Sequence, residues 1–158
     1  FLAALSLVLA GATFGFLIWN KPPARIYMGD AGSLFLGVLI ATLTVRLNPE
    51  TDSKITSFAI PILLLAIPIL DTVVAVASRF RRRVSPFKGG KDHLSHRLIR
   101  CGFTRKVSVI FLWTLSVIFA VIAIIISADF LISDLAILII GLTAWILLLA
   151  TFLSRSDS

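Results

Sequence analysis

Long apolar stretches dominate the chain, and short polar stretches separate them. A helix needs about 20 mostly apolar residues to cross the hydrocarbon layer of a membrane. Five stretches meet or approach that length, and the predicted spans are 1–19, 33–47, 55–78, 107–128 and 131–153. The pattern therefore predicts an all-α polytopic membrane protein, in which 1–158 forms a single integral membrane domain.

Composition and charge agree with a membrane domain. The chain is 58% hydrophobic with a mean hydropathy of +1.03, and only 15% of its residues are charged, whereas about a quarter are charged in a soluble domain. The net charge is +7. In a membrane protein, a basic balance favours anionic lipid or phosphate ligands over nucleic acid, so we expect no nucleic-acid partner.

The basic residues also predict the orientation in the membrane. Ten of the fifteen lie between Arg79 and Lys106, so the positive-inside rule makes this segment cytoplasmic. Alternation of the spans then makes 20–32 and the tail from Ser154 cytoplasmic too. The segments around Glu50 and Asp129 fall on the opposite side.

The first polar segment, 20–33, has the features of an anion site. Two prolines extend the chain, Gly29 and Gly32 bracket Asp30, and Ser33 is expected to open the next helix. The start of a helix offers free backbone N–H groups and a positive dipole end to an anion. Asp30 would suit a phosphate bridged by Mg²⁺, which usually takes one or two carboxylates. In the alternative interpretation, Asp30 and Ser33 merely cap the helix.

The second polar segment carries two histidines. If 93–100 is helical, His93, His96, Arg97 and Arg100 share one face, and two imidazoles with two guanidiniums indicate a phosphate clamp. A zinc site is the rival interpretation, but further ligands are lacking nearby. A solvated basic face against anionic lipid is a second rival.

Asp71 lies within the third apolar stretch. A carboxylate in a span usually faces a cavity or a partner, because its burial in lipid is costly. Pro68 precedes it and removes a backbone hydrogen bond, so we expect a kink there. Asp71 is either a functional group or a structural polar contact.

These segments together resemble a known family. The stretch Pro-Ala-Arg-Ile-Tyr-Met-Gly-Asp-Ala-Gly-Ser-Leu-Phe-Leu-Gly, within 20–37, is similar to a signature loop of the polyprenyl-phosphate N-acetylhexosamine-1-phosphate transferases. Further motifs of that family follow in the same order: Pro68-Ile-Leu-Asp71-Thr72, Arg79, Ser85-Pro86-Phe87 and Asp92-His93-Leu94-Ser95-His96-Arg97-Leu98. The resemblance covers most of 20–102.

The resemblance implies a specific reaction. Members transfer a sugar 1-phosphate from a UDP-N-acetylhexosamine to a polyprenyl phosphate such as undecaprenyl phosphate. They release UMP and require Mg²⁺. The expected location is the bacterial plasma membrane, with the active-site loops cytoplasmic, and the resemblance allows a homodimer.

By position, the resemblance also implies roles for residues of the first motif. Asp30 would ligate Mg²⁺ and act in catalysis, Tyr27 would stack on uracil and Asn20 would hydrogen-bond it. Gly32 and Ser33 fall in the same substrate-binding loop.

In the histidine motif, the resemblance implies that His93, His96 and Arg97 bind the nucleotide diphosphate. We expect both histidines to act in catalysis. Ser95 stands where many relatives carry another histidine. This departure favours the branch that primes cell-surface glycans over the muramoyl-pentapeptide branch.

Family members are about twice as long as this chain and carry paired aspartates that it lacks. The chain opens with Phe1 and its only methionine is Met28. We therefore expect it to be the C-terminal half of a longer transferase. The alternatives are a non-catalytic membrane scaffold, half of a split enzyme, or a transporter subunit.

Overall fold

The computed structural model describes residues 1–46, 54–85, 90, 92–127 and 134–154. Within these ranges it contains seven helices and no strand, which confirms the all-α prediction. The chain divides into two compact units, Phe1–Asn48 and Pro49–Ser158. The segments expected around Glu50 and Asp129 lie outside the described residues, as do Pro86 and Phe87. That 1–158 forms a single membrane domain stays a prediction.

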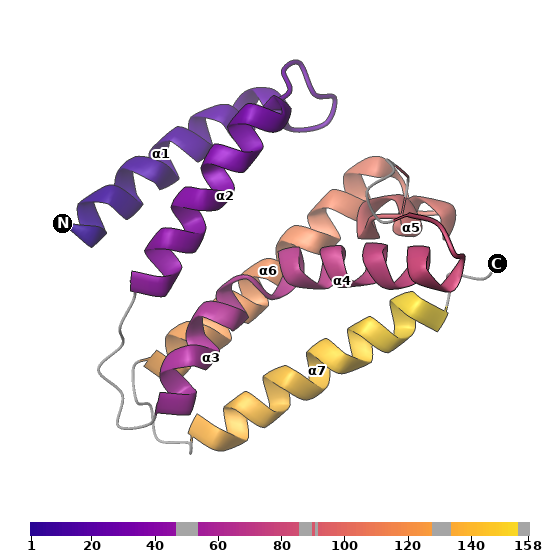
Figure 1. Cartoon of the computed structure of the whole chain (residues 1–158). Helices are drawn as coiled ribbons and strands as arrows, with labels where there is room; N and C mark the ends of the chain where they lie inside the picture. The colour runs from indigo at the N-terminus through magenta and orange to yellow at the C-terminus, as the bar shows by residue number, and fades with distance from the viewer. Residues whose placement is uncertain (47–53, 86–89, 91, 128–133, 155–158) are drawn as a thin grey trace. The chain divides into compact units, whose positions relative to one another are not determined.

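The first unit is a pair of apolar helices, α1 (Leu2–Asn20) and α2 (Gly29–Arg46) (Figure 1). Both are long and apolar enough to cross a membrane. The prediction that the second helix begins at Ser33 was wrong, because α2 begins four residues earlier. Gly29 has a φ of +69°, which glycine adopts without the steric cost that a Cβ would bring. The chain turns into the helix at this residue.

The second unit is a bundle of five helices (Figure 1). They are α3 (Lys54–Leu64), α4 (Ala66–Arg81), α5 (Leu94–Arg100), α6 (Arg105–Ser127) and α7 (Asp134–Ser154). The buried core lies mainly on α3, α4 and α6, and half-buried side chains of α6 and α7 pack against it. Its members of lowest exposure include Leu70, Val74, Leu94 and Ile126, each 0% exposed.

The predicted third span, 55–78, is broken rather than continuous. The axes of Phe58–Leu64 and Ala66–Arg81 differ by 71°. Pro68 explains the break, because it has no N–H for the Leu64 carbonyl and its ring would clash with that carbonyl in a straight helix. The kink expected near Pro68 is therefore confirmed. From α7, the indole Nε1–H of Trp145 donates to the Ala66 carbonyl at 2.9 Å and ties α7 to the start of α4.

The break changes the count of spans within the described residues. Three helices are long and apolar enough to cross a membrane by themselves: α1, α2 and α6. The bent pair gives a fourth span if it counts as one. In α7 the apolar stretch Leu138–Ser154 is shorter than these. The structure thus supports a polytopic membrane protein, with three or four candidate spans among the described residues where the sequence pattern predicted five.

Candidate functional site

The connection between α1 and α2 is organised by contacts at its base. The Arg25 N–H donates to the Trp19 carbonyl at 2.9 Å, and the Asn20 amide nitrogen donates to the Ile26 carbonyl at 2.8 Å. The Arg25 guanidinium also lies 5.9 Å from the centre of the Trp19 ring, within the range of a cation–π contact. These contacts close the loop and leave Tyr27 83% exposed, so its ring is available for stacking.

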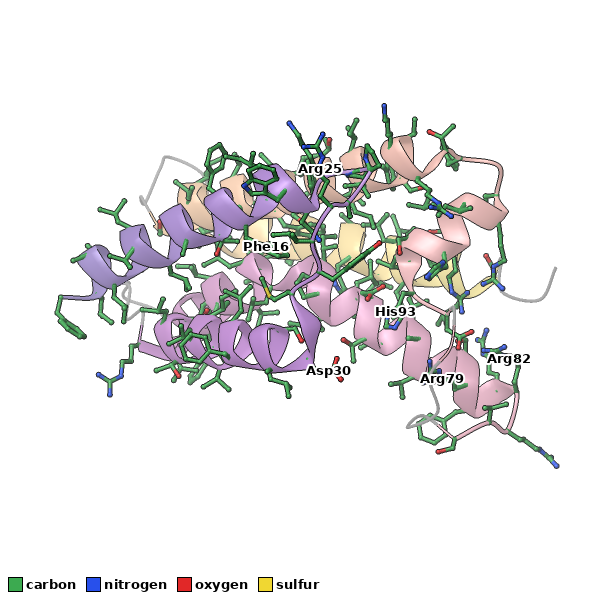
Figure 2. The ribbon with its side chains drawn as sticks, turned by 90° about the horizontal axis from the view of Figure 1, so that it is seen from above. Phe16, Arg25, Asp30, Arg79, Arg82 and His93 are labelled. Atoms are coloured by element: carbon green, nitrogen blue, oxygen red, sulfur yellow. The ribbon has the colours of Figure 1, made fainter. Side chains whose placement is uncertain are left out.

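Asp30 lies in the first turn of α2 and is exposed (Figure 2). A carboxylate at this place interacts favourably with the positive end of the helix dipole. Ser33 does not cap the helix, since its hydroxyl donates to the Asp30 carbonyl at 3.1 Å within the helix. At Gly32 a Cβ would come within 2.5 Å of the Met28 Cγ, so the small residue makes room for that side chain.

A hollow of about 340 Å³ adjoins this loop. It is lined by Ile18, Trp19, Lys21, Pro22, Pro23 and Arg25. Two cations and an indole at one hollow are suited to an anionic ligand with an aromatic or apolar part. This hollow and Asp30 both belong to the first unit.

In the second unit, a buried carboxylate holds two arginines. Arg79 lies in the last turn of α4 and Arg82 is the residue that follows this helix; Figure 2 labels both. The Arg79 Nε donates to an Asp92 carboxylate oxygen at 2.9 Å, and the Arg82 Nη2 donates to the other oxygen. The side chains of Arg79 and Asp92 are 9% and 10% exposed, against 51% for Arg82. A Cβ at Gly90 would lie 2.7 Å from the Asp92 carboxylate, so this close packing needs glycine.

The surroundings of Asp92 have opposing effects on its pKa. Burial raises the pKa, because it disfavours the charged form, while hydrogen bonds and charge from Arg79 and Arg82 lower it. The net result is a pKa below the usual value of 3.8. Asp92 is thus a charged structural anchor between α4 and α5.

His93, His96, Arg97 and Arg100 were expected to share one face as a phosphate clamp, but Arg97 is buried, unlike the other three. This residue is 5% exposed. Its Nε donates to the Asp92 carbonyl at 2.9 Å, and its Nη1 donates to the Phe152 carbonyl of α7 at 2.8 Å. The guanidinium therefore joins α5 to α7, whereas His96 and Arg100 are exposed. A role for Arg97 in binding substrate stays a prediction.

His93 precedes α5 as its N-cap and contacts α4. Its Nδ1 lies 2.8 Å from one carboxylate oxygen of Asp71, and the N–H of Leu94 donates to the other oxygen at 2.6 Å. The side chain of His93 is 48% exposed. The structure thus brings together Asp71 and a histidine of the candidate site, 22 residues apart in the chain. The sequence singled out both residues, but it held no signal for their contact.

No three side chains of His, Cys, Asp or Glu within the described ranges lie close enough to hold a metal ion. A zinc site built from the two histidines therefore lacks a visible ligand set. Asp30 offers one carboxylate. This is enough for Mg²⁺ only where a bound phosphate and water supply the remaining oxygens.

Comparison with known proteins supports the resemblance. Residues 1–48 match glycosyl transferase family 4. The chain is 38% identical over 125 residues to a protein of Bacillus subtilis named probable undecaprenyl-phosphate N-acetylglucosaminyl 1-phosphate transferase, covering 79% of this chain and 35% of that protein. It is 36% identical over 123 residues to decaprenyl-phosphate N-acetylglucosaminephosphotransferase of Mycolicibacterium smegmatis, covering 70% and 30%.

The similarity extends to a further branch. The chain is 36% identical over 116 residues to phospho-N-acetylmuramoyl-pentapeptide-transferase of Maricaulis maris, covering 72% and 29%. No solved structure matches the chain. The chain is thus similar to glycosyl transferase family 4 over its first unit, and the curated proteins that it resembles include polyprenyl-phosphate N-acetylglucosamine 1-phosphate transferases. It spans about a third of the length of the relatives it matches.

Proposed function

We propose that the protein to which this chain belongs transfers N-acetylhexosamine 1-phosphate from a UDP-sugar to polyprenyl phosphate and releases UMP. The observation that carries the proposal is the exposed carboxylate of Asp30 in the first turn of α2, next to a loop that bears Lys21 and Arg25. This arrangement offers a metal ligand and cations to a diphosphate. The relatives' names point to the same chemistry.

The reaction exchanges one phosphoanhydride bond for another. An oxygen of polyprenyl phosphate forms a new bond to the phosphorus that carries the sugar. The bond from that phosphorus to the oxygen bridging the two phosphates breaks, and UMP leaves with the electron pair. Polyprenyl phosphate is already ionised near neutral pH, so it needs positioning more than a strong base. The main task of the protein is to hold anions together and to stabilise the leaving charge.

Residues of the first unit would bind the nucleotide end. Asp30 would hold Mg²⁺, and when bound this ion would supply positive charge to the diphosphate oxygens. Tyr27 is exposed enough to stack on uracil. One N–H of the Asn20 amide is bound to the Ile26 carbonyl, so its carbonyl oxygen and its second N–H are left for the base. Gly32 and Ser33 would bring the helix N-terminus close to a phosphate.

Residues of the second unit would bind phosphate through imidazole. His93 and His96 are exposed and close together in the chain. Arg97 would act indirectly, since its guanidinium fixes α5 against α7. Arg100 is the exposed arginine of this helix and stays in the proposed clamp with the two histidines.

The proposed location is the plasma membrane, with both motif segments in the cytoplasm, where UDP-sugars are found. Contacts at one end of the second unit support this orientation. Arg81 donates to the Leu153 carbonyl and Arg97 to the Phe152 carbonyl, so the end of α7 lies beside the basic segment after α4. These contacts agree with the prediction that 79–106 and the tail from Ser154 lie on the same side of the membrane. A homodimer stays a prediction.

The experiment that tests the function measures UMP. The complete protein, purified in detergent, is given undecaprenyl phosphate, Mg²⁺ and one of UDP-N-acetylglucosamine, UDP-N-acetylgalactosamine or UDP-glucose. We expect UMP in equal amount to a lipid-linked sugar, with an N-acetylated donor, and none without the acceptor. Release of UDP instead of UMP, or no product with any donor, would contradict the proposal.

A further inference from the structure

Asp71 accepts two hydrogen bonds from the start of α5. One oxygen accepts the Leu94 N–H at 2.6 Å, and the other lies 2.8 Å from Nδ1 of His93. The first N–H groups of a helix have no partner within the helix, so a carboxylate there satisfies a group that would otherwise need water. The contact to His93 goes beyond this capping role, since it engages a side chain of the candidate site.

The contact determines which nitrogen of His93 carries a proton. A carboxylate oxygen accepts hydrogen bonds and does not donate them, so Nδ1 must be the donor. In the neutral ring, Nε2 then carries the lone pair, and in the charged ring it becomes a second donor. Asp71 thus turns the ring so that Nε2 can meet a ligand, and only the charged ring offers a donor there to a phosphate oxygen.

The surroundings of Asp71 make it a rigid support. Its neighbours on α4, Leu70 and Val74, are both 0% exposed, and so is Leu94 at the start of α5. These buried residues fix the backbone on both sides of the contact. The side chains of Asp71 and His93 are 33% and 48% exposed. The pair therefore lies at the edge of the packed core, with the ring open to a ligand.

We propose that Asp71 is a positioning residue: it accepts the Nδ1–H of His93 and so holds the ring in the orientation in which the charged imidazole donates its Nε2–H to a phosphate oxygen of the substrate. This inference rests on the proposed function for its ligand. The contact itself depends only on the geometry of the second unit. The competing interpretation is that Asp71 only caps α5.

Asp71→Asn separates the two interpretations. The amide oxygen of asparagine can still accept from the Leu94 N–H, so the cap is kept. The amide nitrogen then faces Nδ1 and donates to it, which leaves the ring neutral with its one proton on Nε2, so the bond to phosphate is no longer charge-assisted. We expect kcat/KM for the UDP-sugar to fall about 10–100-fold, by analogy with the loss of an outer partner from a metal-bound histidine. The KM for polyprenyl phosphate should stay the same, as should the melting temperature.

Two further variants serve as controls for the loss of kcat/KM expected in Asp71→Asn. Thr72→Val alters the neighbouring residue, whose hydroxyl bonds the Pro68 carbonyl of its own helix, and should leave kcat/KM unchanged. The double variant Asp71→Asn/His93→Ala should be no slower than His93→Ala alone, because Asp71 acts through His93. Wild-type kinetics in Asp71→Asn, or a double variant that suffers both losses in full, would overturn the proposal.

A spectroscopic test stands apart from catalysis. In ¹⁵N NMR of histidine-labelled complete protein at alkaline pH, the signal lost in His93→Ala is that of His93. We expect this signal to show the Nδ1–H tautomer in the wild type and the Nε2–H tautomer in Asp71→Asn. A wild-type Nε2–H signal would overturn the positioning role. If no donor yields UMP while the tautomers behave as expected, the proposed function fails and the Asp71–His93 contact stands.

Discussion

The polar segments of the two units hold their charged residues in different ways. Between α1 and α2, the loop is closed mainly by bonds to backbone carbonyls, and the carboxylate of Asp30 is exposed. Between α4 and α5, Asp92 and Arg79 are buried and bind each other. The first segment can therefore lose a side chain with little effect on folding. In the second segment, Asp92, Arg79 and Arg82 form a charged frame that stabilises the fold. The exposed histidines depend on this frame for their position.

The largest effect is expected from breaking the frame of the second unit. Asp92→Asn removes the negative charge from its buried pair with Arg79, and breaking such a pair typically costs about 3–5 kcal/mol of unfolding free energy. Arg82→Ala is the matched control, because this partner is half-exposed and such pairs contribute at most about 1 kcal/mol. Denaturant or thermal unfolding in detergent would measure both. Equal losses in the two variants would mean that burial does not set the strength of this cluster.

Asp30→Asn should reduce activity strongly and stability little, the reverse of what is expected for Asp92→Asn. Losing the proposed metal ligand should reduce UMP release by at least about 100-fold, or about 2.7 kcal/mol in the barrier. The free energy of unfolding should change by no more than the dipole contribution of about 0.3–1 kcal/mol. Arg46→Gln, which neutralises an exposed charge in the last turn of the same helix, should keep full activity. Full activity in Asp30→Asn would contradict the metal assignment.

The pKa of Asp92 predicts how acid acts on the second unit. Because this pKa is lower in the folded state than the usual 3.8, the unfolded state binds more protons between the two values. Stability then rises with pH in that window. The contribution of Asp92 should be complete above about pH 4 and lost as the pH falls below 3.8 toward the folded pKa. In Asp92→Asn this part of the pH dependence of the unfolding free energy should vanish. If the variant and the wild type lose stability equally in acid, the pKa of Asp92 is not lowered by folding.

The smallest effect is expected at the helix break. Trp145→Phe keeps most of the ring packing but removes the donor to the Ala66 carbonyl. A hydrogen bond of this kind contributes about 1 kcal/mol to stability. Trp113→Phe, at a half-exposed site on α6, is the matched control and should have less effect on the melting temperature. A larger loss in the control would mean that Trp145 does not support the break.

Much of the fold could be predicted from the sequence. The length of the apolar stretches predicted most of the helices, and Pro68 predicted the bend. Both features depend on residues that are close together in the sequence. The start of α2 was missed by four residues, since apolar character begins near Ser33 while the helix begins at Gly29. A turn with positive φ at glycine has no hydrophobic signal.

The candidate site was only partly predictable. Helical spacing predicted that Arg97 lies beside the histidines. In the structure Arg97 is buried, and its guanidinium donates to the carbonyls of Asp92 and Phe152. Which side of a short helix is buried depends on α7, some 55 residues away in the chain. The sequence singled out Asp71 because a carboxylate within a membrane span is energetically costly. Its contact with His93 depends on the packing of α5 against α4. A sequence pattern does not encode such distant contacts.

The most direct test of the account measures UMP release and melting temperature together for Asp30→Asn and Asp92→Asn in the complete protein. We expect Asp30→Asn to lose UMP release while keeping its melting temperature, and Asp92→Asn to lower the melting temperature clearly. An active Asp30→Asn together with an Asp92→Asn of unchanged melting temperature would contradict both the proposed chemistry and the division between an exposed site and a buried frame.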